Sequence, residues 1–150
     1  MKAIILTYAT IQDFERDILM NTSIFKLALN HHVAYLKPNA RIITDYVLSG
    51  IMKACPEKII SIREKLRYYS SRVEYPDIEF KSSTIVAAVE YLILKQYNEI
   101  LIIGDNRVHS LEFRNDVNKE LDKLVSIVKI YQYSNGNFNL PVKTIHDFVL

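Results

Sequence analysis

Short apolar runs alternate with helical patterns along this chain. The runs have strand length, are rich in Ile, Leu and Val, and occupy residues 2–8, 25–29, 41–44, 58–62, 99–103 and 127–133. The first run, KAIILTY, is apolar at successive positions, which is typical of a strand covered on both faces. The alternation of strand and helix predicts right-handed βαβ units and a mostly parallel sheet.

Two longer segments between the runs have helical spacing. Residues 83–96 carry a wide apolar stripe, which predicts a helix buried against the sheet. Residues 111–124 place Phe113, Val117 and Leu121 on one face and charged residues elsewhere, which predicts a helix with one solvated side. Shorter helices are predicted at residues 12–20, 32–37 and 47–54.

The chain length indicates one domain. A chain of 150 residues has the usual size of a single domain, and the sequence contains no linker or internal repeat. We therefore expect residues 1–150 to form a single α/β domain with three layers, α/β/α, around the sheet. Residues 67–81 fit neither period, and this long stretch is predicted to be a lid, a binding loop or a distorted helix.

Charge and residue usage exclude several classes of protein. The formal net charge of +2 is too small to predict a nucleic-acid partner. The single cysteine, Cys55, cannot form an internal disulfide and has no spacing typical of a zinc site. His31 and His32 are neighbours in the sequence, so their side chains point in different directions and do not form a pair of metal ligands. The apolar residues 1–6 are too few for a signal peptide or a membrane span, so we expect a cytoplasmic protein without an integral membrane segment.

Polar residues follow most of the predicted strands. In a parallel sheet the carboxyl ends of the strands meet at one edge, where ligands bind. The candidates at this edge are Thr7, Tyr8, Asn30, Asp45, Arg63, Asp105, Asn106, Ser134 and Asn135. Each has an alternative role, because Asn, Asp and Ser after a strand commonly cap the next helix or form a turn. In either case we predict that Asn30, Asp45 and Asp105 lie close together on one rim.

The turn between the first predicted strand and the first predicted helix has no glycine-rich phosphate-binding motif. Residues 7–13 contain no glycine, so neither a GxGxxG fingerprint nor a P-loop is present. A conventional NAD-binding or ATP-hydrolysing role is disfavoured, and no cofactor is predicted. His109 follows the strand that ends at residue 103, and its imidazole can accept a proton near neutral pH. The alternative is an exposed loop histidine beside a helix N-cap at Ser110.

Four segments together resemble a known family: FKLALN at residues 25–30, PNARIITD at 38–45, KSST at 81–84 and YNEILIIGD at 97–105. The sequence resembles the Rossmann-like fold shared by bacterial CMP-sialic-acid-dependent sialyltransferases and the motility accessory factor proteins of flagellar glycan biosynthesis. The sequence departs from this family in the first turn, where Tyr8-Ala-Thr-Ile-Gln stands in place of a Gly-Asn-Gly-Pro-Ser type loop.

The resemblance implies a set of site residues. Asn30 and Asp45 would approach the nucleotide, and Ser83 and Thr84 would face the sugar nucleotide. His109, which is followed by serine, would be the catalytic base.

Two functions follow from these observations, and the sequence leaves open whether the protein is an enzyme. The first is a sugar-nucleotide-binding, sialyltransferase-like glycosyltransferase, complete or degenerate, in surface-glycan biosynthesis. Its CMP-sugar would be surrounded by Asn30, Asp45, Ser83, Thr84, Asp105 and Asn106, with His109 as base.

The second is a non-catalytic interaction protein on the same scaffold, which predicts a homo-oligomer or a complex. Its interface would use tyrosines, namely Tyr68, Tyr69, Tyr75, Tyr131 and Tyr133. The two functions differ in whether the strand-end crevice is open and polar or filled by side chains such as Tyr8 and Phe14.

Overall fold

The strands form one parallel sheet. The computed structural model describes residues 1–7, 11, 13–30, 36–44, 56–62, 72–104, 110–134 and 136–150. In this part of the chain the strand order is β5-β4-β3-β2-β1-β6-β7, and every neighbouring pair is parallel. The strands are β1 (Lys2–Leu6), β2 (Phe25–Leu29), β3 (Ala40–Ile43), β4 (Lys58–Ser61), β5 (Val73–Glu74), β6 (Glu99–Ile103) and β7 (Lys129–Gln132). The helices are α1 (Asp13–Asn21), α3 (Thr84–Leu94), α4 (Leu111–Leu124) and α5 (Ile145–Val149).

The predicted α/β architecture with a parallel sheet is confirmed, with two additions. Each predicted strand is present, with ends that differ by at most two residues. Strand β5 was not predicted and lies inside the stretch 67–81, which is therefore partly an edge strand; the structure does not describe residues 67–71. Helix α5 was not predicted either, and it begins after Thr144, whose hydroxyl accepts a hydrogen bond from the Asp147 amide. Of the predicted helices at 32–37 and 47–54, all but residues 36 and 37 lie outside the described residues.

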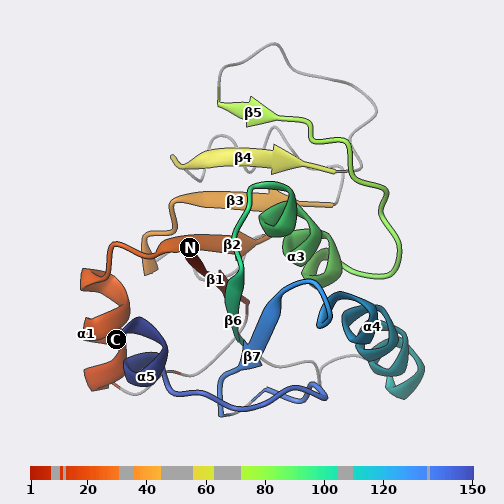
Figure 1. The fold of residues 1–150 in the computed structure, drawn as a ribbon. Helices are drawn as coiled ribbons and strands as arrows, with labels where there is room; N and C mark the ends of the chain where they lie inside the picture. The colour runs from red at the N-terminus through yellow and green to blue at the C-terminus, as the bar shows by residue number, and fades with distance from the viewer. Residues whose placement is uncertain are drawn as a thin grey trace.

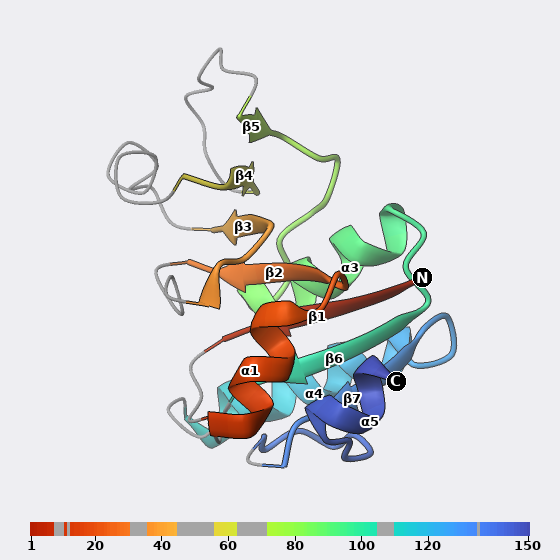
Figure 2. The ribbon, with the colours of Figure 1, turned by 90° about the vertical axis from the view of Figure 1, so that its left-hand side faces the viewer.

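Helices cover both faces of the sheet and make a Rossmann-like three-layer fold. Figures 1 and 2 show α1 and α5 on one face and α3 and α4 on the other. Successive side chains of a strand point to opposite faces. In β1, Ile4 packs in the cluster with α1 and α5, whereas Ile5 packs in the cluster with α3 and α4. The central strands are therefore apolar at nearly every position because both of their faces are buried.

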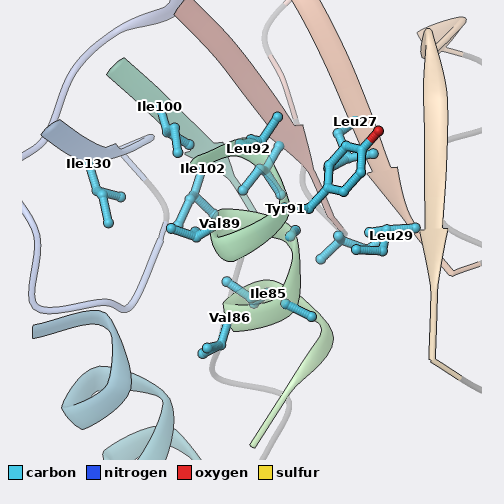
Figure 3. Close-up of a cluster of buried hydrophobic side chains, with 14 of the residues drawn as sticks. Leu27, Leu29, Ile85, Val86, Val89, Tyr91, Leu92, Ile100, Ile102 and Ile130 are labelled. Atoms are coloured by element: carbon cyan, nitrogen blue, oxygen red, sulfur yellow. The ribbon is translucent and has the colours of Figure 1, made fainter. Parts of the chain in front are cut away.

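Helix α3 provides much of the core on its face of the sheet. Figure 3 shows Val86, Val89 and Leu92 of α3 among sheet side chains that include Ile100 and Ile102. All five side chains are buried, and each stabilises the fold by about 1.5–3 kcal/mol through removal of apolar surface from water. In the described part of the chain, no helix is both long enough and apolar enough to cross a bilayer.

Glu74 ties the edge strand β5 to its neighbours. Its carboxylate accepts a hydrogen bond from the Tyr91 hydroxyl at 3.1 Å and forms ion pairs with the Nζ atoms of Lys58 at 2.6 Å and Lys95 at 3.1 Å. Burial raises the pKa of Glu74, but the hydrogen bonds and charges of the two lysines outweigh it and hold that pKa below its ordinary value of 4.5. Burial also raises the pKa of Tyr91, so its hydroxyl remains a neutral donor.

We expect Glu74 to stabilise the fold only while it is ionised. Its pKa is lower in the folded than in the unfolded protein, so its contribution is complete above the unfolded value and is lost as the pH falls through the folded value. Lys58 and Lys95 are nearly half exposed, so Glu74→Gln should lower the free energy of unfolding by only about 1 kcal/mol at pH 7. Urea unfolding from pH 7 to about pH 3 should show this difference vanish, because the protonated carboxyl resembles the amide. The exposed Glu79→Gln is the control, and a difference that persists at low pH would contradict the expectation.

Candidate functional site

A cavity of about 220 Å³ opens at the carboxyl ends of β1 and β2, against the first turn of α3. We call it the α3 cavity. It is lined by Thr7, Leu29, Asn30, Phe80, Ser82, Ser83, Thr84, Ile85 and Phe113. Strand β1 lies between β2 and β6, so the cavity is beside the point where the strand order reverses. Ligands of open α/β sheets bind at this position, because connections on the two sides diverge there.

Asn30 joins three elements at the edge of this cavity. It follows β2 with φ of 48°, a left-handed conformation that asparagine tolerates better than most residues. Its Nδ2 donates a hydrogen bond to Thr84 Oγ1 at 3.2 Å, and its Oδ1 accepts one from the Thr44 amide at 3.3 Å. The Thr44 and Thr84 hydroxyls are also hydrogen-bonded, at 2.8 Å. The ends of β2 and β3 are thereby fixed to the start of α3.

The start of α3 supplies polar groups of two kinds. Ser83 is the N-cap, and its hydroxyl accepts a hydrogen bond from the Val86 amide at 3.2 Å, so it satisfies the helix itself. The neighbouring Ser82 has a buried Oγ with no hydrogen-bond partner in the described structure. The first amides of a helix have no intrahelical acceptor, and Thr84 and Ile85, which carry them, line the cavity. The arrangement offers hydrogen-bond donors and a positive helix end to a bound group.

The remaining walls of the α3 cavity are apolar. They are formed by Leu29, Phe80, Ile85 and Phe113, and no charged side chain of the described residues lines the space. A few convergent polar groups within apolar walls are typical of a small-molecule site. The volume lies below the range of about 300–1,000 Å³ common for whole ligands, so this space suits one part of a larger molecule.

The structure brings together four of the predicted residues, Thr7, Asn30, Ser83 and Thr84, whereas the exposed Ser134 does not line the α3 cavity. The others, Asp45, Asp105, Asn106 and His109, lie outside the described residues, as do Tyr8, Arg63 and Asn135. The expectation that Asn30, Asp45 and Asp105 share one rim therefore stays a prediction. Phe14 is 59% exposed on α1 and does not fill the crevice. Thr44 and Ser82 are the residues that sequence reasoning missed. The only signal in the sequence for either residue was its position: Thr44 directly precedes the candidate Asp45, and Ser82 lies in the segment KSST at residues 81–84.

The proposed tyrosine interface is wrong for one residue. Tyr133 is buried, and its hydroxyl donates a hydrogen bond to the buried carboxylate of Glu15, which also accepts one from the Ile145 amide at 3.2 Å. Tyr131 is half-buried and packs edge-to-face on Phe148, with ring centroids 6.3 Å apart. Tyr68 and Tyr69 lie outside the described residues. Tyr133 is therefore part of the core and cannot supply contact area to a partner.

The described structure has a further cavity away from the strand-end edge, and its described residues include no metal centre. A cavity of about 320 Å³ lies beside residues 98–99 and 125–129, at the amino ends of β6 and β7, opposite to the edge where ligands of this fold bind. The described residues contain no group of three or more His, Cys, Asp or Glu side chains that could hold a metal ion. Comparison of the chain with protein-family models, curated proteins and solved structures yields no match.

Proposed function

We propose that this protein binds a sugar nucleotide of the CMP-sugar class, in a sialyltransferase-like manner, with the α3 cavity holding its phosphate-bearing part. The observation that carries the proposal is the buried, unpartnered Ser82 hydroxyl beside the first turn of α3, at the strand-end edge of a parallel sheet. A phosphate oxygen there would accept hydrogen bonds from this hydroxyl and from the amides of Thr84 and Ile85. The apolar walls would contact the less polar part of the ligand.

Asn30 and Thr84 have a supporting role in this proposal. Their mutual hydrogen bond, together with the contacts of both to Thr44, holds the first turn of α3 in one position relative to β2. A preorganised site binds more tightly, because less conformational freedom is lost on binding. If glycosyl transfer occurs, a base must accept the proton of the acceptor hydroxyl, and His109 is the residue that the sequence offers for this step.

Ser82→Ala separates binding from folding. We expect the variant to bind CMP at least about tenfold more weakly than the wild type, because a hydrogen bond to a charged group contributes about 1.5–3 kcal/mol. Its thermal stability should be unchanged or higher by up to about 1 kcal/mol, because the buried hydroxyl has no partner to lose. Calorimetric titration with CMP and with CMP-sialic acid, alongside thermal unfolding, measures both quantities.

Ser126→Ala is the matched control. Ser126 is exposed, its hydroxyl bonds the Lys123 carbonyl at 3.3 Å, and it lies away from the α3 cavity. This variant should bind both ligands as the wild type does. If the wild-type protein binds neither CMP nor CMP-sialic acid saturably at millimolar ligand, the proposal is refuted. That result would favour the non-catalytic interaction protein.

A further inference from the structure

A groove lies beside the second half of α3, away from the α3 cavity. It has a volume of about 310 Å³ and opens between the segment 77–81 and the helix. Its apolar lining consists of Ile78, Ile93 and Leu94, and the Leu94 side chain is 55% exposed. Apolar side chains that remain in contact with water in a hollow of the surface commonly mark a site for a partner. We call this space the acidic groove.

The acidic groove carries a net negative charge. Its lining includes the carboxylates of Asp77, Glu79 and Glu90 and one ammonium group, that of Lys81, so the formal charges sum to −2. Lys81 Nζ pairs with Glu90 at 2.9 Å. Asp77 and Glu79 are exposed, and none of the ion pairs between described residues includes either of them. The groove therefore suits a partner segment that combines apolar side chains with positive charge.

A loop of the same chain has this composition. Residues 123–129 read KLVSIVK and run from the end of α4 to the first residue of β7. Val125 is 45% exposed and Ile127 is 64% exposed. Lys123 and Lys129 flank these two residues and are also exposed. We call residues 123–129 the basic loop.

The acids nearest to the two lysines bind them only weakly. Glu99 is opposite Lys129 in the sheet register, but it is half-buried, and no ion pair joins the two side chains in the described structure. Glu120 pairs with Lys123 at 3.1 Å, and the Lys123 side chain is still 60% exposed. Surface ion pairs of this kind contribute little stability and exchange readily for another partner. Both lysines can therefore meet carboxylates of a second molecule.

The acidic groove and the basic loop are neighbours in the fold. Leu94 of the groove and Asn98 are four residues apart, so at most about 14 Å of chain separates them. The Asn98 carbonyl oxygen accepts a hydrogen bond from the Lys129 amide at 3.1 Å, and Asn98 lines the same cavity as Ile127. A two-fold axis between the two surfaces would place the basic loop of each copy at the acidic groove of the other. The same contact is then made twice, and the assembly closes as a dimer.

We propose that this protein forms a two-fold dimer in which the basic loop of each copy docks in the acidic groove of the other. The exposed apolar side chains of the loop would cover those of the groove, with Lys123 and Lys129 facing Asp77 and Glu79. Burial of apolar surface supplies the affinity, and the charges select which segment enters the groove. The inference is independent of the proposed function, because neither surface lines the α3 cavity.

The test measures dimerisation of the full chain by sedimentation equilibrium, from about 10 µM to about 1 mM. The wild type should show a reversible monomer–dimer equilibrium within this range. A groove variant, Asp77→Lys with Glu79→Lys, and a loop variant, Lys123→Glu with Lys129→Glu, should each dimerise at least about tenfold more weakly. Each variant sets like charges against one another at both contacts of the dimer. The quadruple variant should recover most of the lost affinity, because the charges on both sides are exchanged.

Asp13→Lys with Asp17→Lys is the matched control. Both residues are exposed on α1, which covers the opposite face of the sheet (Figure 2), so this charge reversal should leave dimerisation unchanged. Circular dichroism and thermal unfolding verify that each variant is folded.

Four results would overturn the inference: a wild type that stays monomeric at about 1 mM, groove and loop variants that dimerise as the wild type does, a folded quadruple variant that recovers no affinity, or assemblies that grow beyond two copies. Titration of the loop variant with CMP keeps the two proposals apart. The loop variant should bind CMP as the wild type does, so failure of the dimer leaves the proposed function standing. Conversely, a dimer that binds no CMP leaves the interface standing and refutes the proposed function.

Discussion

Arg41→Ala should lower the free energy of unfolding by about 3–5 kcal/mol, the cost of leaving one partner of a buried ion pair without the other. The side chain of Arg41 is fully buried, and its Nε bonds Glu57 Oε1 at 2.5 Å. Its Nη1 also donates to the Asn30 carbonyl oxygen at 2.7 Å. Removal of the guanidinium leaves the Glu57 carboxylate, which is only 9% exposed, without its cationic partner. It also removes the donor to the Asn30 carbonyl oxygen. Equilibrium unfolding in urea measures the effect.

Arg16→Ala is the matched control for this measurement. Arg16 pairs with Asp13 at 3.6 Å, and the two side chains are 43% and 97% exposed, so loss of this solvent-screened pair should cost about 0–1 kcal/mol. Arg41→Lys should recover only part of the stability, because an ammonium group cannot hold two separate acceptors in the geometry of a guanidinium. If Arg41→Ala costs no more than Arg16→Ala, the buried pair does not stabilise the sheet as expected.

Asn30→Ala should reduce both stability and ligand binding. Alanine at φ of 48° is strained by about 1–2 kcal/mol. Loss of the side-chain hydrogen bonds to Thr84 and to the Thr44 amide adds about 1 kcal/mol for each. Partial compensation should leave a total of about 2–3 kcal/mol. CMP should bind more weakly as well, because the first turn of α3 is no longer tied to β2.

Two further variants of Asn30 separate these causes. Asn30→Gly removes the side chain but tolerates the left-handed backbone, so it should be more stable than Asn30→Ala. Asn30→Asp keeps the acceptor for the Thr44 amide and loses the donor to Thr84. Asn21→Ala is the control at an exposed asparagine whose Nδ2 bonds the Asp17 carbonyl at 2.9 Å. Equal stability of Asn30→Ala and the wild type would show that Asn30 does not hold the strand ends together.

The sequence predicted well those elements whose side chains face the core. Strands β2 and β6 are apolar at every position except Lys26 and Glu99, and their predicted bounds agree with the structure. Helix α4 was also predicted with its observed bounds, because Val117 and Leu121 are buried and its other side is charged. Strand β5 has only two residues, and both are half-buried, so it leaves no hydrophobic period to detect.

The polar contacts required the tertiary structure. In the sequence, nothing distinguishes Arg41 from the other basic residues. Only the fold shows that it is buried against Glu57 and the Asn30 carbonyl. Ser82 and Ser83 are adjacent and chemically identical, yet one caps α3 and the other has no partner. Which of two serines is the cap depends on where the helix begins, and that is set by the packing of α3 on the sheet.

By itself the sequence determined the α/β class, the parallel sheet and the edge of the sheet where Asn30 and Thr84 meet. These properties follow from hydrophobic periodicity and from the rule that parallel strands end at one edge, and both are local or topological. Only the tertiary structure decided which hydroxyl remains unpaired, where the α3 cavity opens, and that Tyr133 belongs to the core. The physical reason is that each hydrogen bond or cavity depends on distances between residues far apart in the chain, which no local pattern encodes.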